Sequence, residues 1–203
     1  MDENNEELIK AVSAADIAAS KLALAAGADV NTRGLNGLTP LMIAICTGSL
    51  GLCRLLIRAN ADLAITAATG WTALHLAAAC GLTEVVAALM EAGADVSSRD
   101  SLHWTALMVA ASDGHDGVCR ALLKHGTTLD YHDINGDTAL MLATDCGNGS
   151  TCRLLLDSGA NRTKYNHFGH SAEDMARTRE MKKLFVETIE KRRSGRRKRA
   201  VAG

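Results

Sequence analysis

A block of 33 residues recurs along this chain in constant register, and this recurrence constrains the fold more than any other feature. Residues 70–102 read GWTALHLAAACGLTEVVAALMEAGADVSSRDSL, and related blocks begin at residues 37, 103 and 136. A more divergent block begins at Gly169, again 33 residues after the one before it. A fixed period of this kind is typical of repeat architectures, in which each unit buries its apolar face against its neighbours.

Within each block the residue types predict two short helices and an exit turn. The first helix follows a threonine whose hydroxyl can cap its free N–H groups. Glycine ends this helix and most copies of the second one, because a left-handed residue costs glycine least. In the first full copy Asn60 stands where the second helix ends, and asparagine also tolerates that conformation. The four threonines are Thr39, Thr72, Thr105 and Thr138.

The 33-residue period, together with the T-[PA]-L-[HM] core that begins at each of these threonines, resembles the ankyrin repeat. The resemblance covers nearly the whole chain and implies an all-α solenoid of stacked helix-turn-helix units with hairpin-like loops. It places an ankyrin-repeat domain over residues 4–190. Four full repeats would span 37–69, 70–102, 103–135 and 136–168, between degenerate N- and C-terminal capping repeats at 4–36 and 169–190. The end repeats should be polar outside, since they lack a neighbour on one side.

The chain departs from the family pattern at several places. The histidine of the TPLH motif remains only as His75, and methionine replaces it in the other full repeats. In the family that imidazole ties the loop to the helix start, so the other three loops are expected to be held mainly by packing. His103 stands where the other repeats begin with glycine, which should strain or alter the turn. The same repeat ends in HGTTLD instead of GADVN, a second irregularity.

Motifs for chemistry are missing from the sequence. There is no phosphate-binding glycine loop, no G-x-S-x-G and no H-E-x-x-H. The six cysteines form no C-x-x-C pair, and the seven histidines are spread over different repeats, so we expect no metal site. The sequence therefore predicts a non-catalytic protein with no cofactor and no small-molecule substrate.

Three of the cysteines, Cys53, Cys119 and Cys152, occupy one position of three repeats among apolar neighbours. Equivalent positions of stacked helices lie roughly 8–10 Å apart, which is too far for a disulfide. We expect these side chains to be small buried hydrophobic groups and all six cysteines to be reduced. No apolar stretch is long enough to cross a membrane, and the acidic start MDENNEELIK lacks the pattern of a signal peptide. An intracellular protein, cytoplasmic, nuclear or both, is expected.

The strongest functional signal is a series of residues in the loops between repeats. In the family, the residue before each capping threonine points toward the concave side where partners dock. Both tryptophans of the chain, Trp71 and Trp104, occupy this position, and tryptophan is enriched at interface hot spots. We therefore expect both indoles to be substantially exposed and to anchor a partner. Leu35 also lies in these loops. The alternative is that each indole folds over its own loop and covers helix ends. The predicted partner-binding residues are Leu38, Trp71, Leu102, Trp104, Ile134, Asp137, Phe168 and His170.

A basic tail, residues 191–203, contrasts with the rest of the chain, which has 15 basic and 23 acidic residues. We expect it to be disordered. It could serve as a nuclear localisation signal for an import adaptor, aid solubility, or fold back onto the acidic body. Sequence-specific nucleic-acid binding is not expected, because such charges grip phosphates but cannot read bases. Its basic residues are Lys191, Arg192, Arg193, Arg196, Arg197, Lys198 and Arg199.

The sequence therefore predicts a protein–protein interaction module, such as an adaptor, an inhibitor or a chaperone-like scaffold. A preformed surface would lose little entropy when it binds a partner protein. The alternative is a nuclear or nucleic-acid-associated regulator that uses the basic tail.

Overall fold

The computed structural model describes residues 2–34 and 37–188 of the chain. The chain divides into two compact units, Met1–Ala106 and Leu107–Gly203. The predicted basic tail lies outside the described residues. Helices are the main elements of both units, and the described residues contain only two isolated β-bridges, His132 with Thr138 and Tyr165 with Ser171.

The helices are short and follow the period of the sequence. First helices of full repeats have seven residues and second helices have nine. A further helix covers residues 179–188. In chain order the others are α1 (Glu3–Ser13), α2 (Ile17–Ala25), α3 (Pro40–Cys46), α4 (Leu50–Arg58), α5 (Ala73–Ala79), α6 (Thr83–Glu91), α7 (Ala106–Ser112), α8 (Asp116–Lys124), α9 (Ala139–Asp145) and α10 (Gly149–Asp157).

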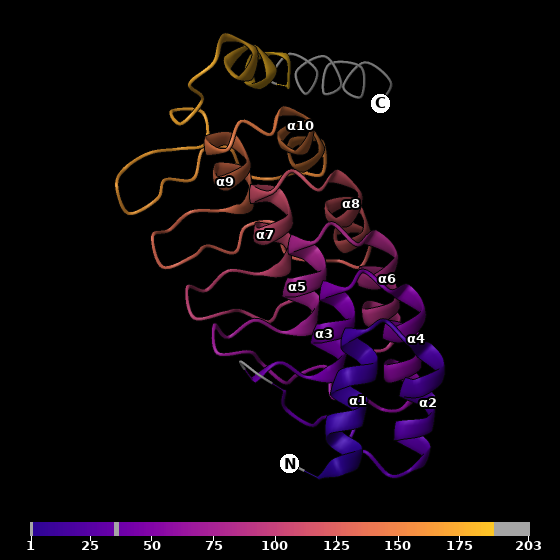
Figure 1. Ribbon diagram of the computed structural model, residues 1–203. Coiled ribbons are helices and arrows are strands. Elements are labelled where there is room, and N and C mark those ends of the chain that lie inside the picture. The colour runs from indigo at the N-terminus through magenta and orange to yellow at the C-terminus, as the bar shows by residue number, and fades with distance from the viewer. Residues whose placement is uncertain (1, 35–36, 189–203) are drawn as a thin grey trace, which may run out of the picture. The chain divides into compact units, whose positions relative to one another are not determined.

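In the unit Met1–Ala106 the helices form two layers. The first helices α1, α3 and α5 pack in sequence on one another, and α2, α4 and α6 form the second row behind them. The loops between repeats project from the side of the first row (Figure 1). Leu41, Ala44, Leu74 and Ala77 are buried between the rows, where alanine allows helices to approach closely. This arrangement is the all-α repeat stack that the sequence predicts.

The helix ends confirm much of the local interpretation. The Thr39 hydroxyl accepts a hydrogen bond from the Met42 N–H at 3.3 Å, and that of Thr138 accepts one from Met141 at 3.4 Å. Asn60 has a φ of 61°, so it takes the place of glycine as predicted. Ala15 was not foreseen: it has a φ of 56° at the position where the full repeats have glycine. Its side chain should strain this turn, because left-handed backbone is unfavourable for alanine.

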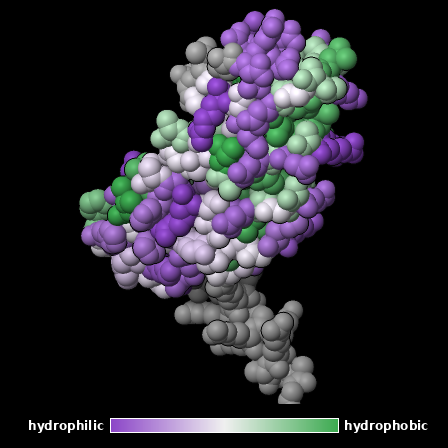
Figure 2. Space-filling model, turned by 90° about the horizontal axis from the view of Figure 1, so that it is seen from below, coloured by the Kyte–Doolittle hydropathy of each residue, from purple (hydrophilic) through white to green (hydrophobic). Residues whose placement is uncertain are grey.

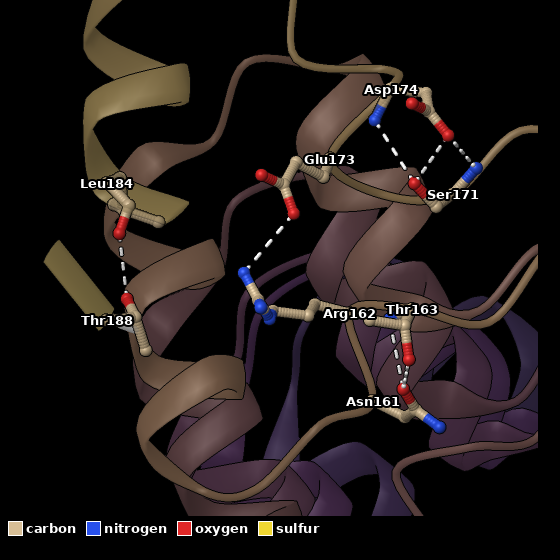
Figure 3. Close-up of polar contacts among 8 residues, drawn as sticks. All are labelled: Asn161, Arg162, Thr163, Ser171, Glu173, Asp174, Leu184 and Thr188. Carbon is tan, nitrogen blue, oxygen red and sulfur yellow. Dashed lines mark hydrogen bonds and ion pairs between the residues drawn. The ribbon is translucent and has the colours of Figure 1, made fainter. Parts of the chain in front are cut away.

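In the unit Leu107–Gly203, α9 pairs with α10, and α10 also packs on α8. The last repeat retains only one turn of its first helix before the helix at residues 179–188. Figure 3 shows how polar groups support it: the Asp174 carboxylate accepts hydrogen bonds from the N–H and the hydroxyl of Ser171, at 2.9 and 2.6 Å. Glu173 forms an ion pair with Arg162 at 3.2 Å, and Phe185 is fully buried.

Large apolar side chains also remain on the surface. Figure 2 shows apolar residues in small patches among hydrophilic ones on the face that it presents. The exposed ones fall into two groups. Ile17, Leu22 and Val186 lie on helices, whereas Leu102, Ile134, Tyr165 and Phe168 lie in the loops between repeats.

Candidate partner-binding surface

The loops between repeats share one pattern of backbone hydrogen bonds. In each loop the first residue donates an N–H to the carbonyl of the residue that precedes the capping position, as Asp100 does to Trp104 at 3.0 Å. The fourth residue donates back to the first carbonyl, as His103 does to Asp100 at 3.0 Å. His103 has a φ of 63° where the other loops have glycine, so the turn keeps its form with a left-handed backbone that is unfavourable for a residue with a Cβ. The loops are residues 34–38, 67–71, 100–104, 133–137 and 166–170.

Three of these loops have additional side-chain support. Asp100 Oδ1 accepts hydrogen bonds from the N–H groups of Leu102 and Trp104, at 2.9 and 2.8 Å. Asp133 and Asn166 make the same pair of bonds in their own loops. The bonds to the two aspartates are stronger than bonds between neutral groups. In all three loops one side-chain oxygen holds two N–H groups of the turn, which fixes the loop tip. The two earlier loops have Gly34 and Ala67 at this position, and neither side chain can accept such bonds.

Both tryptophans are half-buried, so the expected large exposure of their indoles is wrong. The Trp71 indole N–H donates to Asp100 Oδ2 of the next loop at 2.8 Å. Its ring stacks on His75 with a centroid separation of 6.4 Å. Trp71 therefore joins two consecutive loops rather than covering its own. Sequence reasoning missed this contact because the partner lies 29 residues further along the chain.

The residue before the capping threonine also contacts the next loop in the other unit, but there donor and acceptor are exchanged. There Asp137 accepts a hydrogen bond from the Asn166 side-chain amide at 2.7 Å. Burial raises the pKa of the Asp137 carboxyl, and the bond from Asn166 opposes that rise. In one unit the donor belongs to the earlier loop, and in the other it belongs to the later loop. Each pair is chemically matched, whereas exchanging one partner would bring together two donors or two acceptors.

His75 takes the structural role that the family resemblance implies. Its Nδ1 accepts the N–H of Thr72 at 3.3 Å, which assigns the proton to Nε2. Nε2 then donates to the Trp104 carbonyl at 3.0 Å, so the ring connects its own helix start to the next loop. Burial lowers the pKa of the imidazole. In the fourth full repeat the Met141 sulfur lies 3.5 Å from the Thr138 N–H, so it takes over the acceptor role alone.

The loop tips present the exposed part of the surface. Leu102 is 49 % exposed, Ile134 48 % and Phe168 69 %. Tyr165, 68 % exposed in the last loop, was missed by the sequence analysis, although it stands where other loops have Arg33 and His132. Among the other predicted residues, Leu38 and Asp137 are half-buried and His170 is exposed. Leu35 lies outside the described residues.

The family of the chain follows from its match to a sequence model of ankyrin repeats in three copies, which covers residues 8–100 and 98–166. The chain belongs to the ankyrin-repeat family. Ankyrin repeats mediate protein–protein interactions, and members of the family are typically not enzymes. A comparison of this ankyrin-repeat chain with curated proteins gives no significant match.

Over residues 2–34 and 37–188, no helix has the length and apolar character needed to cross a membrane. In the same part of the chain, no group of three or more His, Cys, Asp or Glu side chains is placed to hold a metal ion.

Proposed function

We propose that this ankyrin-repeat protein is a non-catalytic interaction module that binds a partner protein through its loop tips. The observation that carries the proposal is the exposure of large apolar side chains at the ends of loops whose backbone is fixed. Loops rarely keep such residues in water without a use, and exposed apolar patches mark interaction sites.

The fixed backbone supports the proposal energetically. Asp133 and Asn166 hold their loop tips through hydrogen bonds to the N–H groups on both sides of the apex. Ile134 and Phe168 therefore offer apolar area without first having to order a loop. A preorganised surface loses less conformational entropy on binding, which leaves more of the contact energy as affinity. Trp71 and Trp104 are half-buried beside these loops, and Trp71 also joins two of them through its bond to Asp100.

The test compares apolar side chains of similar exposure in different places. Phe168→Ser removes a loop-tip side chain, and Leu22→Ser removes an equally exposed one, 72 %, from α2. The wild type would be used to capture and identify a partner, and its affinity for each purified variant would then be measured by calorimetry. We expect Phe168→Ser to weaken binding at least tenfold and Leu22→Ser to leave it unchanged, with equal melting temperatures. Equal affinity for all three proteins would reject the loop tips as the binding surface.

Tryptophan variants are a poorer probe than the sequence suggested. Because Trp71 donates to Asp100, its replacement by alanine should lower stability as well as affinity.

A further inference from the structure

The six cysteines are free thiols, and they fall into two groups that differ in access to solvent. Cys53, Cys119 and Cys152 are buried, and burial raises the pKa values of their thiols to about 11, 12 and 11. They pack as the apolar groups that the sequence predicts and hold little thiolate at neutral pH. The three exposed cysteines lie where first helices end: Cys46, Cys80 and Cys146. The proposed partner surface uses none of them.

Two of the exposed cysteines occupy a pair of positions that the fold brings together. Cys46 is the last residue of α3, and Cys80 is the residue that caps the end of α5 in the next repeat. The same pair of positions recurs in the other unit as Ser112, the last residue of α7, and Cys146, which caps α9. There the Ser112 hydroxyl lies 3.5 Å from the Cys146 sulfur.

The backbone supports this equivalence. Cys80 has φ −78° and ψ −2°, and Cys146 has φ −76° and ψ −5°, so both side chains leave the chain in the same direction. The helices α3 and α5 pack directly on each other. Burial raises the pKa of the Cys80 thiol, and the nearby Cys46 raises it further, in agreement with the packing of the two helices.

We propose that Cys46 and Cys80 are a reversible oxidation site, at which a small-molecule disulfide converts the two thiols into one intramolecular disulfide. The Cys46 thiolate attacks a sulfur of the oxidant, forms a mixed disulfide and releases one thiolate. Cys80 then loses its proton to water and attacks the Cys46 sulfur, which forms the Cys46–Cys80 bond and releases the second thiolate. Two protein thiols are oxidised and one disulfide is reduced to two thiols.

The order of attack follows from the environment of the pair. Because the pKa of Cys80 is raised, less of it is thiolate, and it is the poorer nucleophile for the first attack on the oxidant. It suits the second attack, on the mixed disulfide at Cys46, because the nearness of the Cys46 sulfur compensates for the small thiolate fraction. A disulfide requires a sulfur–sulfur distance of about 2.05 Å, so the two side chains must move together when the bond forms. Both residues lie at helix ends, where the chain turns through glycine (Gly48 and Gly81) and can adjust. The new bond would fasten neighbouring repeats to each other.

Oxidised glutathione is the probe for the test, applied to the full-length native protein and followed by alkylation of remaining thiols and tandem mass spectrometry. Fragment spectra are needed because Cys46 shares the tryptic peptide 34–54 with Cys53. We expect a Cys46–Cys80 crosslink that has lost two hydrogens, carries no glutathione and is reversed by dithiothreitol. Cys146, which faces a serine, should instead keep a glutathione adduct.

Three variants complete the test. Cys80→Ser should leave Cys46 trapped as the glutathione mixed disulfide, and Cys46→Ser should abolish the crosslink. Ser112→Cys rebuilds the pair in the other unit and should create a second crosslink, with Cys146. Separate glutathione adducts on Cys46 and Cys80 in the wild type, or crosslinks only between two molecules, would overturn the proposal.

Discussion

The loops at residues 67–71 and 100–104 have the same backbone hydrogen bonds but different means of holding them. In the first, Ala67 offers no side-chain acceptor, and the turn contains Gly70. In the second, the Asp100 carboxylate accepts three hydrogen bonds, from two backbone N–H groups and the Trp71 indole, while His103 occupies a left-handed position. The comparison teaches that the repeat determines the path of the chain, whereas single side chains determine how firmly a loop is held.

The largest effect should come from removing the carboxylate. Asp100→Ala loses three hydrogen bonds to a buried charged group, and we expect it to lower the free energy of unfolding by about 3 kcal/mol. Asp100→Asn should cost less, because its oxygen still accepts from the loop although its amide cannot pair with the Trp71 donor. Urea denaturation of the purified proteins measures both changes.

The converse substitution sharpens the comparison. Ala67→Asp supplies the missing acceptor in the earlier loop and should raise stability by about 1 kcal/mol. If Asp100→Ala cost as little as a typical surface substitution, the side-chain bonds would not be what holds the loop.

The fourth position of the two loops should respond in opposite directions. A Cβ on Gly70 would lie 2.9 Å from the Ser101 backbone nitrogen at a φ of 82°, so Gly70→Ala should destabilise by about 2 kcal/mol. His103→Gly removes a side chain from a left-handed position and should stabilise by about 1 kcal/mol. Thermal unfolding followed by circular dichroism measures both, and destabilisation by His103→Gly would mean that the imidazole makes contacts that outweigh its strain.

Acid should weaken the hydrogen bonds by which His75 joins its own helix start to the loop at residues 100–104. Burial lowers the pKa of this imidazole in the folded protein, so the unfolded chain binds the proton more readily. Its contribution to stability is therefore complete above the unfolded pKa of about 6.5 and is lost as the pH falls below it. His75→Met, the residue of the other full repeats, should cost about 1 kcal/mol at pH 7.5. It should also flatten the decline in stability between about pH 6.5 and 5. Equal slopes for both proteins would show that other groups cause the decline.

The sequence predicted the parts of the structure that depend on the repeat itself. The period follows from the recurrence of the sequence, and the caps at Thr39 and Thr138 and the left-handed Asn60 follow from residue types within single repeats. The structure confirms these two caps and the conformation of Asn60. The contacts between loops were not predicted from the sequence, because the hydrogen-bond partner of Trp71 lies in a later repeat that has diverged. Aligning positions 29 residues apart would have revealed the matched pairs of Trp71 with Asp100 and of Asp137 with Asn166. Ala15 could have been recognised from the 33-residue period, since it stands 33 residues before Gly48.

The smallest effect on stability is expected from deleting residues 191–203, which lie outside the described structure. If the loops and helices hold the fold, removal of the seven basic residues should leave the free energy of unfolding unchanged at physiological salt, where exposed charges are screened within about 8 Å. A loss of stability that disappears in high salt would instead support attraction between the tail and the acidic body.

We also expect a fluorescent fusion of the shortened chain to leave the nucleus, because clustered Lys and Arg residues are typical of import signals. The matched control replaces the seven basic residues by glutamine and keeps the length. If neither change alters the distribution, the tail acts only on solubility; if either abolishes partner binding, the tail belongs to the binding surface.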